Sequence, residues 1–301
     1  MNQEIRSPIP PAIRTALASW FPELDATSWQ LLGEGFGSVV LEHPAANLIC
    51  RLCRTTEAGS RLLAIRTVAG LIPESAPFAV PRPVWSLPAS VNPVAPYGAI
   101  AYRKLPGIPL NPHLCREATL PSIIDCLVHI HTTPLDMPDA RNLRTWHQEE
   151  QHRHQTWRAI RDVLRHRLTP SEFRTVETWQ QTPAPEPPAH CLVHGDFWQE
   201  NLLIEPTSGA ITGILDWENA HCGDPAIDFS PLNYPDPRFA REILTGYLHR
   251  TGHDDATFTR RVQWHWQGRE FSGIYLSLLM EDEEELTESI EKLRNGGLLS
   301  P

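Results

Sequence analysis

The fold of this chain can be read outward from one stretch, Leu192-Val193-His194-Gly195-Asp196-Phe197-Trp198-Gln199-Glu200-Asn201. Apolar runs flank it, and a second acidic run follows in Gly213-Ile214-Leu215-Asp216-Trp217-Glu218. Asn201 lies five positions after Asp196, and Asp216 lies fifteen positions after Asn201. Asp, Asn and Gly are common in ordinary turns, so either motif alone has a purely structural interpretation. The two motifs together, in this order and with strand-like flanks, supply carboxylates and an amide, the residue types that phosphoryl transfer uses.

Phosphoryl transfer sets simple demands on a protein. It needs a carboxylate that holds and deprotonates the attacking hydroxyl, oxygen ligands for Mg²⁺, and cations or N–H groups for the phosphates. Mg²⁺ prefers carboxylate and amide oxygens and usually takes only one or two of them from the protein. These demands predict Asp196 as the base, with Asn201 and Asp216 as the metal ligands.

The motifs also carry a family resemblance. His194-Gly195-Asp196 with Asn201, followed by Asp216-Trp217-Glu218, resembles the aminoglycoside phosphotransferase and choline-kinase-like small-molecule kinases. Gly223-Asp224-Pro225-Ala226-Ile227-Asp228 resembles a further signature of that family. The resemblance implies an α+β, bilobal, protein-kinase-like fold. A small N-terminal lobe, an antiparallel β-sheet with a helix, would bind the nucleotide, and a larger, mainly helical C-terminal lobe would bind substrate.

A glycine-rich run, Gly33-Glu34-Gly35-Phe36-Gly37-Ser38, separates two predicted strands at 29–32 and 39–42. Alternate glycines let a backbone fold tightly, with its N–H groups facing an anion. Gly33, Gly35, Gly37 and Ser38 are therefore predicted to cover the nucleotide phosphates, although glycine-rich hairpins also occur without a ligand. No Gly-Lys-Ser/Thr helix start is present, so a P-loop is not expected.

The third predicted strand, 47–54, carries Arg51 where kinases place a phosphate-binding Lys. Arg binds phosphate bidentately, so Arg51 is a candidate phosphate ligand. The alternative is a strand-edge charge that reaches solvent. Glu57, before the helix predicted at 58–70, is the only acid between Arg51 and Glu74, and its pairing with Arg51 is open. Cys50 and Cys53 form a CxxC pattern, but inside an apolar strand, which argues against a redox or zinc role.

A strand predicted at 97–102 leads into Arg103-Lys104-Leu105-Pro106-Gly107-Ile108-Pro109-Leu110. This segment resembles the hinge between the lobes of the same family, where backbone groups such as those of Arg103 and Leu105 would pair with the adenine edge. The boundary is therefore placed near Pro106, with lobes at 1–105 and 106–301. A strand followed by a Pro-Gly turn would need no nucleotide.

The C-terminal part is predicted from helical spacing and turn chemistry. Helices are expected at 118–131, within 141–181, and at 237–250, 255–280 and 282–295. A hairpin after Asn201 would bring Asn201 close to Asp216. Asp224 before Pro225 suits a helix N-cap, and Asp228 is expected to brace the catalytic turn through backbone N–H groups. Glu200, Trp264 and Glu270 are candidates for contact with the substrate.

Composition narrows the class of protein. The net charge of −10 over 301 residues argues against nucleic acid as a partner. Seven of the 36 acidic residues lie in Glu281–Lys292, so much of this charge is local. The chain has no apolar run of about 18 residues, so no membrane span is predicted. Its six cysteines lack the spacing of a disulfide framework, which suggests reduced thiols and a cytoplasmic location. A monomer or homodimer is expected.

The predicted function is transfer of the γ-phosphate of ATP (or GTP), with Mg²⁺, to a hydroxyl of a small molecule, as in aminoglycoside and macrolide kinases. A metabolite kinase acting on a sugar, amino alcohol or sugar-amine is the alternative enzyme. A nucleotide-binding pseudokinase without turnover is the alternative from another class, favoured a little by Arg51 in place of Lys.

Overall fold

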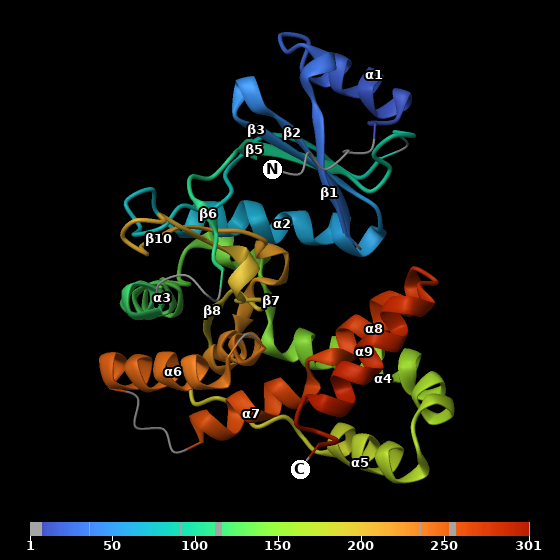
Figure 1. Cartoon of the computed structure of the whole chain (residues 1–301), viewed down its shortest axis with the longest axis vertical. Coiled ribbons are helices and arrows are strands. Elements are labelled where there is room, and N and C mark those ends of the chain that lie inside the picture. Colours follow the sequence, from blue (N-terminus) through green and yellow to red (C-terminus); the bar gives the residue numbers. More distant parts are fainter. Residues whose placement is uncertain are drawn as a thin grey trace.

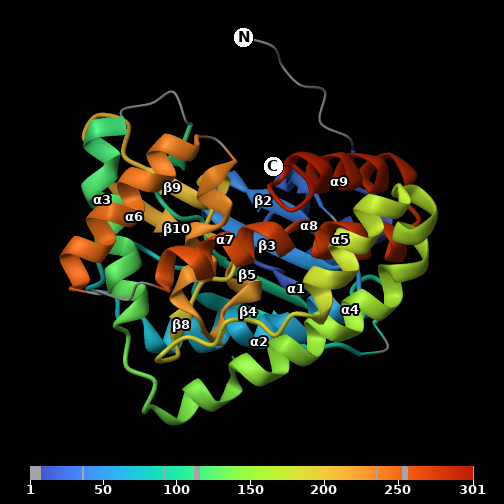
Figure 2. The same cartoon turned by 90° about the horizontal axis from the view of Figure 1, so that it is seen from below.

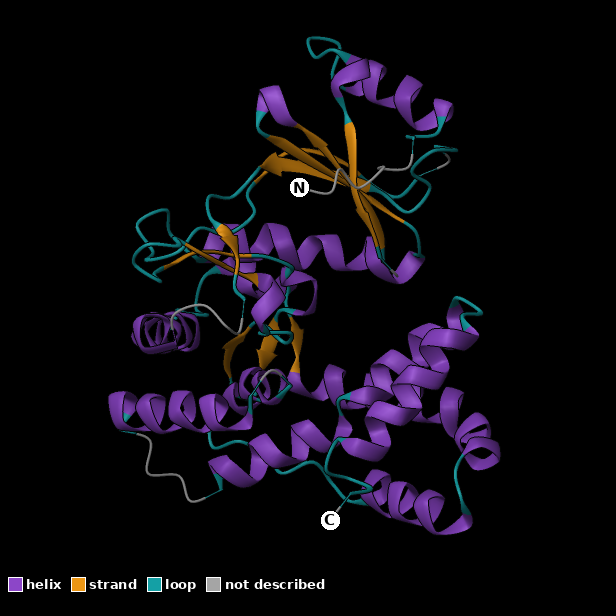
Figure 3. Cartoon of the chain, viewed as in Figure 1, coloured by secondary structure: helices purple, strands orange, loops and turns teal. Residues whose placement is uncertain are grey.

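The computed structural model describes residues 8–35, 37–90, 92–111, 116–234, 236–252 and 257–300, without the side chains of residues 116 and 117. A sheet-rich part lies above a larger, mainly helical part (Figure 1). The predicted α+β architecture, with a small antiparallel-sheet lobe first and a helical lobe second, is confirmed (Figure 3).

The N-terminal lobe contains one antiparallel sheet, in the order β1-β2-β3-β5-β4. Its strands are β1 (Gln30–Glu34), β2 (Ser38–His43), β3 (Leu48–Cys53), β4 (Pro83–Leu87) and β5 (Ala99–Arg103). The prolines after residue 73 obscured β4 in the sequence. Pro83 is tolerated because it begins an edge strand, where a missing N–H costs no ladder bond.

Two helices cover the two faces of this sheet. Leu48, Cys50 and Leu52 of β3 pack with α1 (Pro11–Trp20), whereas Ile49 and Cys53 pack with α2 (Thr56–Leu71). Side chains alternate along a strand, so Arg51 lies on the α2 face, toward the second lobe. Cys50 and Cys53 lie on opposite faces, and burial raises the pKa of each to about 12. They are therefore two separate core thiols, as the apolar strand predicted.

Two small sheets organise the start of the C-terminal lobe. One has the order β10-β9-β6, from β6 (Ile108–Pro109), β9 (Leu202–Ile204) and β10 (Ile211–Ile214). The other has the order β7-β11-β8, from β7 (Arg144–Thr145), β8 (Cys191–Val193) and β11 (His221–Gly223). The β9–β10 pair is the predicted hairpin after Asn201.

The helices of this lobe form two groups. α3 (Arg116–His131) packs on α6 (Pro237–Thr251), and α8 (Glu270–Leu279) packs on α9 (Glu283–Asn295) and on α4 (Trp146–Arg167), which also contacts α5 (Pro170–Gln181). The view from below places the first group and the second on opposite sides (Figure 2). α7 (Phe258–Gly268) leads into α8. Short 3-10 turns cover Ala26–Ser28, Pro44–Ala46, Pro138–Asn142, Gln199–Asn201, Trp217–Asn219, Pro225–Phe229 and Pro231–Asn233.

Local sequence explains where several helices begin. Thr145 and Gln148 form a capping box at the start of α4, and Thr169 and Glu172 form another at α5. The single helix predicted over 255–280 was wrong, because it is two helices that meet at Arg269. The N–H of Arg269 bonds to the carbonyl of Trp266, three residues back, which interrupts the α-helical ladder.

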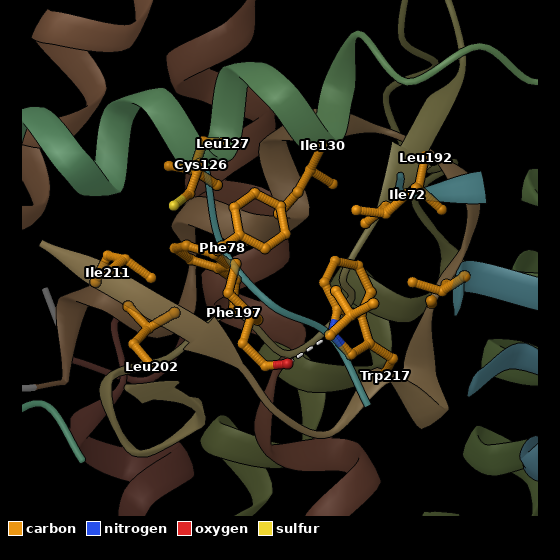
Figure 4. Close-up of a cluster of buried hydrophobic side chains, with 14 of the residues drawn as sticks. Ile72, Phe78, Cys126, Leu127, Ile130, Leu192, Phe197, Leu202, Ile211 and Trp217 are labelled. Atoms are coloured by element: carbon orange, nitrogen blue, oxygen red, sulfur yellow. Dashed lines mark hydrogen bonds between the residues drawn. The ribbon is translucent and has the colours of Figure 1, made fainter. Parts of the chain in front are cut away.

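The main core lies directly beneath the two acidic motifs. Phe197 follows Asp196 and Trp217 follows Asp216, and both aromatic side chains are fully buried (Figure 4). The indole of Trp217 donates to the carbonyl of Ile214 at 2.9 Å. Truncating such buried rings typically costs about 3–5 kcal/mol. The aromatic half of each motif therefore anchors its loop, while the acidic half is left on the surface of the core.

No helix in the described part of the chain is both long and apolar enough to cross a membrane.

Candidate active site

The turn that carries Asp196 is held from below by a buried carboxylate. Asp228 accepts the N–H of His194 at 2.9 Å and the N–H of Gly195 at 2.8 Å, and its third partner is Nε2 of His131 at 3.1 Å. The predicted bracing role of Asp228 is thus confirmed. Burial by itself would raise the pKa of Asp228, but His131 and His194 bring it below its usual value. The carboxylate therefore stays charged in the core.

Glycine is required in this turn. Gly195 has φ +79°, and a Cβ there would lie 2.5 Å from the carbonyl oxygen of Asn219. His194 connects the two motifs, because its Nε2 lies 2.7 Å from the carbonyl oxygen of Leu215. The chain can therefore turn sharply between strand β8 and Asp196, and the two acidic motifs are held side by side.

Asn201 and Asp216 meet beside Asp196, as predicted. Nδ2 of Asn201 donates to the carbonyl of Asp196 at 2.9 Å, and the N–H of Leu215 donates to the carbonyl of Asn201 at 2.8 Å. Asp216 has φ +59°, a left-handed conformation that Asp tolerates better than most residues. These bonds bring together residues that are up to twenty positions apart in sequence.

The donor set at this point fits Mg²⁺. The amide of Asn201 uses its nitrogen toward Asp196, so its oxygen is the atom available to a cation. Within the described residues, no hydrogen bond is donated to Oδ1 of Asn201 or to Oδ2 of Asp216. One amide and one carboxylate oxygen suit Mg²⁺, which keeps several waters. No group of three or more His, Cys, Asp or Glu side chains among the described residues could hold another metal.

Arg51 reaches this same point from the N-terminal lobe. Its Nη1 lies 3.2 Å from Oδ1 of Asp216 and its Nη2 lies 2.7 Å from Oε1 of Glu218. The guanidinium also donates to Oγ of Ser38, from Nη2 at 3.1 Å. Burial by itself lowers the pKa of Arg51, but Asp216 and Glu218 raise it above its usual value. Arg51 is thus a mostly buried cation within the site rather than a strand-edge charge.

The open pairing of Arg51 with Glu57 does not occur. Glu57 lies in the first turn of α2 and its carboxylate binds Arg61, one helical turn later, with His152 at 3.8 Å. Arg61 also binds the side chain of Asn219. Glu57 therefore lines the cleft wall, and Glu218 takes the role of partner to Arg51.

The glycine-rich run forms the tip of the β1–β2 hairpin. Gly33 lies within β1, where the register with β2 shifts, and the N–H of Gly35 donates to the carbonyl of Ser38 at 3.0 Å. The carbonyl of Gly37 accepts from the N–H of Arg54 at 2.9 Å. Phe36 lies outside the described residues. The hairpin thus places Ser38 directly on Arg51.

The predicted hinge follows β5. Arg103 is the last residue of β5, pairs with Leu48, and its side chain donates to the carbonyl of Ala46. Leu105 packs against Gly213, where an added Cβ would lie 3.1 Å from a Leu105 methyl group. Four residues then separate β5 of the first sheet from β6 of the second.

A cavity of about 490 Å³ opens beside Asp196. Its walls come from α2, α4, α8 and α9, and Glu270 lines it as predicted. Burial raises the pKa of Glu270 to about 7. Glu200 lies elsewhere: its side chain is exposed on the 3-10 turn and does not line this cavity.

Trp264 lies outside this cavity and in an adjoining pocket of about 140 Å³. Its ring stacks on Trp179 with centroids 4.7 Å apart, and the guanidinium of Arg153 lies over it. Trp264 is therefore first a packing residue of the α4–α5–α7 region, with one edge toward the side pocket.

Arg269 is the site residue that sequence reasoning missed. Its Nη2 donates to Oδ1 of Asp196 at 2.9 Å, and its guanidinium lies over the ring of Tyr234. The sequence placed it in the middle of a continuous helix. The one signal in the sequence was Gly268, a glycine inside the predicted helix and directly before Arg269. In the structure a Cβ at Gly268 would lie 2.4 Å from Trp179.

The two-lobed architecture is that of the protein-kinase-like fold. A profile of the phosphotransferase enzyme family matches residues 28–261, and the chain belongs to that family. Among solved structures, it is similar to the APH(2")-IIIa enzyme in complex with GDP and kanamycin, with a TM-score of 0.78, 18% identity, and 94% of this chain and 97% of that chain covered. It is also similar to macrolide 2'-phosphotransferase type I, with a TM-score of 0.69, 18% identity, and 95% and 98% covered.

Two curated mouse proteins resemble part of the chain. Acyl-CoA dehydrogenase family member 11 of Mus musculus is 28% identical over 120 residues, which cover 33% of this chain and 15% of that protein. Acyl-CoA dehydrogenase family member 10 of Mus musculus is 28% identical over 134 residues, which cover 44% of this chain and 12% of that protein. The chain thus spans less than a sixth of the length of these relatives.

Proposed function

We propose that this chain transfers the γ-phosphate of ATP or GTP to a hydroxyl of a small molecule, with Mg²⁺ as cofactor. The observation that carries the proposal is the way the two motifs are joined. Asn201 donates to the carbonyl of Asp196 at 2.9 Å and accepts the N–H of Leu215, the residue before Asp216, at 2.8 Å, while Arg51 donates to Asp216 at 3.2 Å. A module that only binds nucleotide has no need of a base in addition to metal ligands. The complex of APH(2")-IIIa with GDP and kanamycin and the ternary complex of APH(2")-IIa with streptomycin and ATP give support from the same fold.

In the proposed reaction the acceptor oxygen forms a bond to the γ-phosphorus. The bond from that phosphorus to the β–γ bridging oxygen breaks, and the nucleoside diphosphate leaves with the electron pair. The hydroxyl proton passes to the carboxylate of Asp196, whose position is set by the Asp228 brace. Asn201 and Asp216 would hold Mg²⁺, which when bound supplies positive charge to the phosphates.

The remaining residues bind and orient the nucleotide. Arg51 presents its guanidinium to the phosphates, and the backbone of Gly33, Gly35, Gly37 and Ser38 covers them. We propose that the purine ring of the nucleotide lies beside Arg103 and Leu105, between a first lobe at 1–105 and a second lobe at 106–301. The described cysteines are all free thiols, which supports the proposal of a reducing, cytoplasmic location.

Thermal unfolding with ATP and with GTP, each with and without Mg²⁺, tests the nucleotide site. A ligand at 100 times its dissociation constant stabilises a protein by about 2.7 kcal/mol, which a melting curve detects. We expect a shift that depends on Mg²⁺. Well-folded protein that shifts with neither nucleotide would overturn the proposal, with Arg51 as the first residue to examine. A nucleotide-dependent shift with neither phosphate transfer nor slow metal-dependent ATP hydrolysis would point to the nucleotide-binding pseudokinase.

Two acceptor classes follow from the proposal. Aminoglycosides such as kanamycin and the macrolides are the first to test, because structural relatives are named for them. A metabolite kinase is the second candidate, and one observation favours it. Four Lys or Arg side chains line the cavity beside Asp196, against four Asp or Glu side chains, so the cavity is not an acidic receptor for a polyamine.

A further inference from the structure

The charge balance of the cavity is made of specific pairs. Its acids are Glu57, Glu149, Asp196 and Glu270, and its cations are Arg61, Arg144, Arg269 and Lys292. Three of these acids already bind a cation of the same cavity. Glu57 binds Arg61, Glu149 binds Arg144 at 2.9 Å, and Asp196 binds Arg269 at 2.9 Å. The fourth, Glu270, is buried and ionises only partly near neutral pH.

An acceptor with several ammonium groups would find few free carboxylates here. Each ammonium that replaced a cavity cation would leave that cation without a partner. Like charges brought together without solvent are strongly disfavoured, and such repulsion is a common means of rejecting ligands. The excess of acid on this chain lies elsewhere, with seven acidic residues in Glu281–Lys292.

Arg269 has binding capacity to spare. A guanidinium carries five N–H donors. Within the described part of the chain, Arg269 uses one of them, toward Oδ1 of Asp196, and its flat face rests on Tyr234. Its side chain is 23% exposed and lines the cavity. The remaining donors are therefore available to a ligand that lies next to the catalytic carboxylate.

On the basis of the proposed function, we propose that Arg269 binds an anionic group of the acceptor, close to the hydroxyl that Asp196 deprotonates. The acceptor is then a hydroxyl compound with a carboxylate or phosphate group rather than a polycation. Arg is suited to this task, because its planar fork binds carboxylate and phosphate bidentately. The same guanidinium would hold Asp196 and the acceptor anion together, which fixes the hydroxyl beside its base.

Binding to a matched hexose series tests the inference. Glucose, glucosamine, glucuronate, glucose 6-phosphate and kanamycin are compared by thermal shift on the full chain, with ADP and Mg²⁺ saturating so that the nucleotide's own phosphate contacts are occupied. We expect glucuronate or glucose 6-phosphate to bind about 10- to 100-fold more tightly than glucose, as for hydrogen bonds to a charged group. The two anionic members distinguish a carboxylate from a phosphate. A three-carbon series of glycerol, serinol, glycerate and glycerol 3-phosphate extends the test to smaller acceptors.

Variants assign the preference to Arg269. Arg269→Gln should abolish the difference between anionic and neutral members, and Arg269→Lys should keep part of it. Arg250→Gln is the matched control, because Arg250 forms an exposed ion pair with Asp125 between α6 and α3, away from the cavity. The inference is overturned if kanamycin or glucosamine binds better than the anionic hexoses, if neither series shows a preference for anions, or if Arg269→Gln retains that preference.

Kinetics separate substrate binding from an effect on the base. For an anionic and a neutral acceptor that are both phosphorylated, Arg269→Gln should raise the KM of the anionic acceptor about 10-fold or more. The KM of the neutral acceptor should change little. An equal fall in kcat for both would mean that Arg269 acts only on Asp196, and would overturn the inference. Transfer restricted to neutral or cationic acceptors would also overturn it but leave the proposed function intact. If no nucleotide shifts the unfolding temperature of the wild-type protein, the proposed function itself is contradicted. The hexose comparison would then be made without ADP.

Discussion

Nη1 of Arg51 lies 3.2 Å from Oδ1 of Asp216, although the two residues are 165 positions apart. The contact joins strand β3 of the first lobe to the loop after β10 of the second. Glu218 is the second partner of Arg51, at 2.7 Å. The predicted phosphate-binding cation is therefore paired with a predicted metal ligand. Phosphate and Mg²⁺ would separate them, so nucleotide and metal binding should be strongly coupled.

Arg51→Gln should destabilise the protein and remove nucleotide binding. Glu218 would be left almost buried without its cation, and burial already raises its pKa. An unpaired buried polar group costs about 1–3 kcal/mol, which a urea unfolding midpoint can resolve. The double variant with Glu218→Gln should recover part of the stability. Arg54→Gln is the control for stability, since Arg54 is 40% exposed and 3.8 Å from Glu34. Equal losses from the two single Arg variants would contradict the network.

Asp196→Ala should lower turnover about 10²- to 10⁴-fold, the usual contribution of a general base. The Mg²⁺-dependent thermal shift with nucleotide should persist, because Asp196 is not assigned to the nucleotide. Glu200→Gln is the matched control, four residues away and exposed, and should behave as wild type. Near-full activity in Asp196→Ala would rule out Asp196 as the base.

Asp216→Asn should raise the Mg²⁺ concentration needed for activity. Asn tolerates the left-handed conformation at φ +59°, so the loop should stay in place, whereas Ala would add strain. Loss of an outer-shell partner alone often costs 10- to 100-fold in metal affinity, so loss of a ligand should cost about 10-fold or more. A Mg²⁺ titration of the nucleotide-dependent thermal shift measures this, and an unchanged midpoint would exclude Asp216 as a ligand.

Asp228→Ala should unfold the catalytic turn rather than alter its chemistry. It would leave two buried N–H groups and His131 without their acceptor, a loss of about 3–5 kcal/mol for a broken buried charged network. Asp125→Ala, which removes an exposed ion pair, should cost less than about 1 kcal/mol. Comparable unfolding midpoints for the two variants would contradict the structural role of Asp228.

The same carboxylate should contribute to acid sensitivity. The pKa of Asp228 is lower in the folded protein than its usual value of 3.8. The contribution of Asp228 to the free energy of unfolding is therefore complete above pH 3.8. It is lost as the pH falls through the lower, folded-state pKa. The stability difference between wild type and Asp228→Asn should shrink over that acid range, as urea unfolding at several pH values would show. A difference that does not change with pH would argue against the charged form.

Glu270 should affect the pH dependence of stability in the opposite sense to Asp228, and Glu270→Gln tests this. Burial raises the pKa of Glu270 from 4.5 to about 7, with Lys292 opposing and Glu285 reinforcing the rise. The unfolded chain releases this proton first, so Glu270 destabilises the fold progressively from pH 4.5 to about 7, by on the order of 3 kcal/mol. Glu270→Gln should therefore gain relative to wild type as pH rises through this window. Parallel urea midpoints from pH 4.5 to 8 would refute this prediction.

The sequence by itself determined the order of the two lobes and the local presentation of the catalytic residues. Alternation along Leu48–Cys53 separated the two strand faces, Gly195 permitted the turn, and Phe197 and Trp217 followed each Asp as anchors. These features depend on residues within a few positions of one another, so the local sequence is enough to predict their backbone geometry and burial. The β9–β10 hairpin brought Asn201 to Asp216 for the same local reason.

Only the tertiary structure decided the partners of the charged residues. Glu57 was the nearest acid to Arg51 in sequence, yet Glu218 is its partner, because α2 directs Glu57 toward Arg61 instead. Arg269 reaches Asp196 from 73 positions away because the helix predicted over 255–280 breaks at that residue. Glu200, next to Asn201 in sequence, faces solvent. An ion pair depends on which surfaces pack together, and that depends on the whole core rather than on the spacing within any one segment.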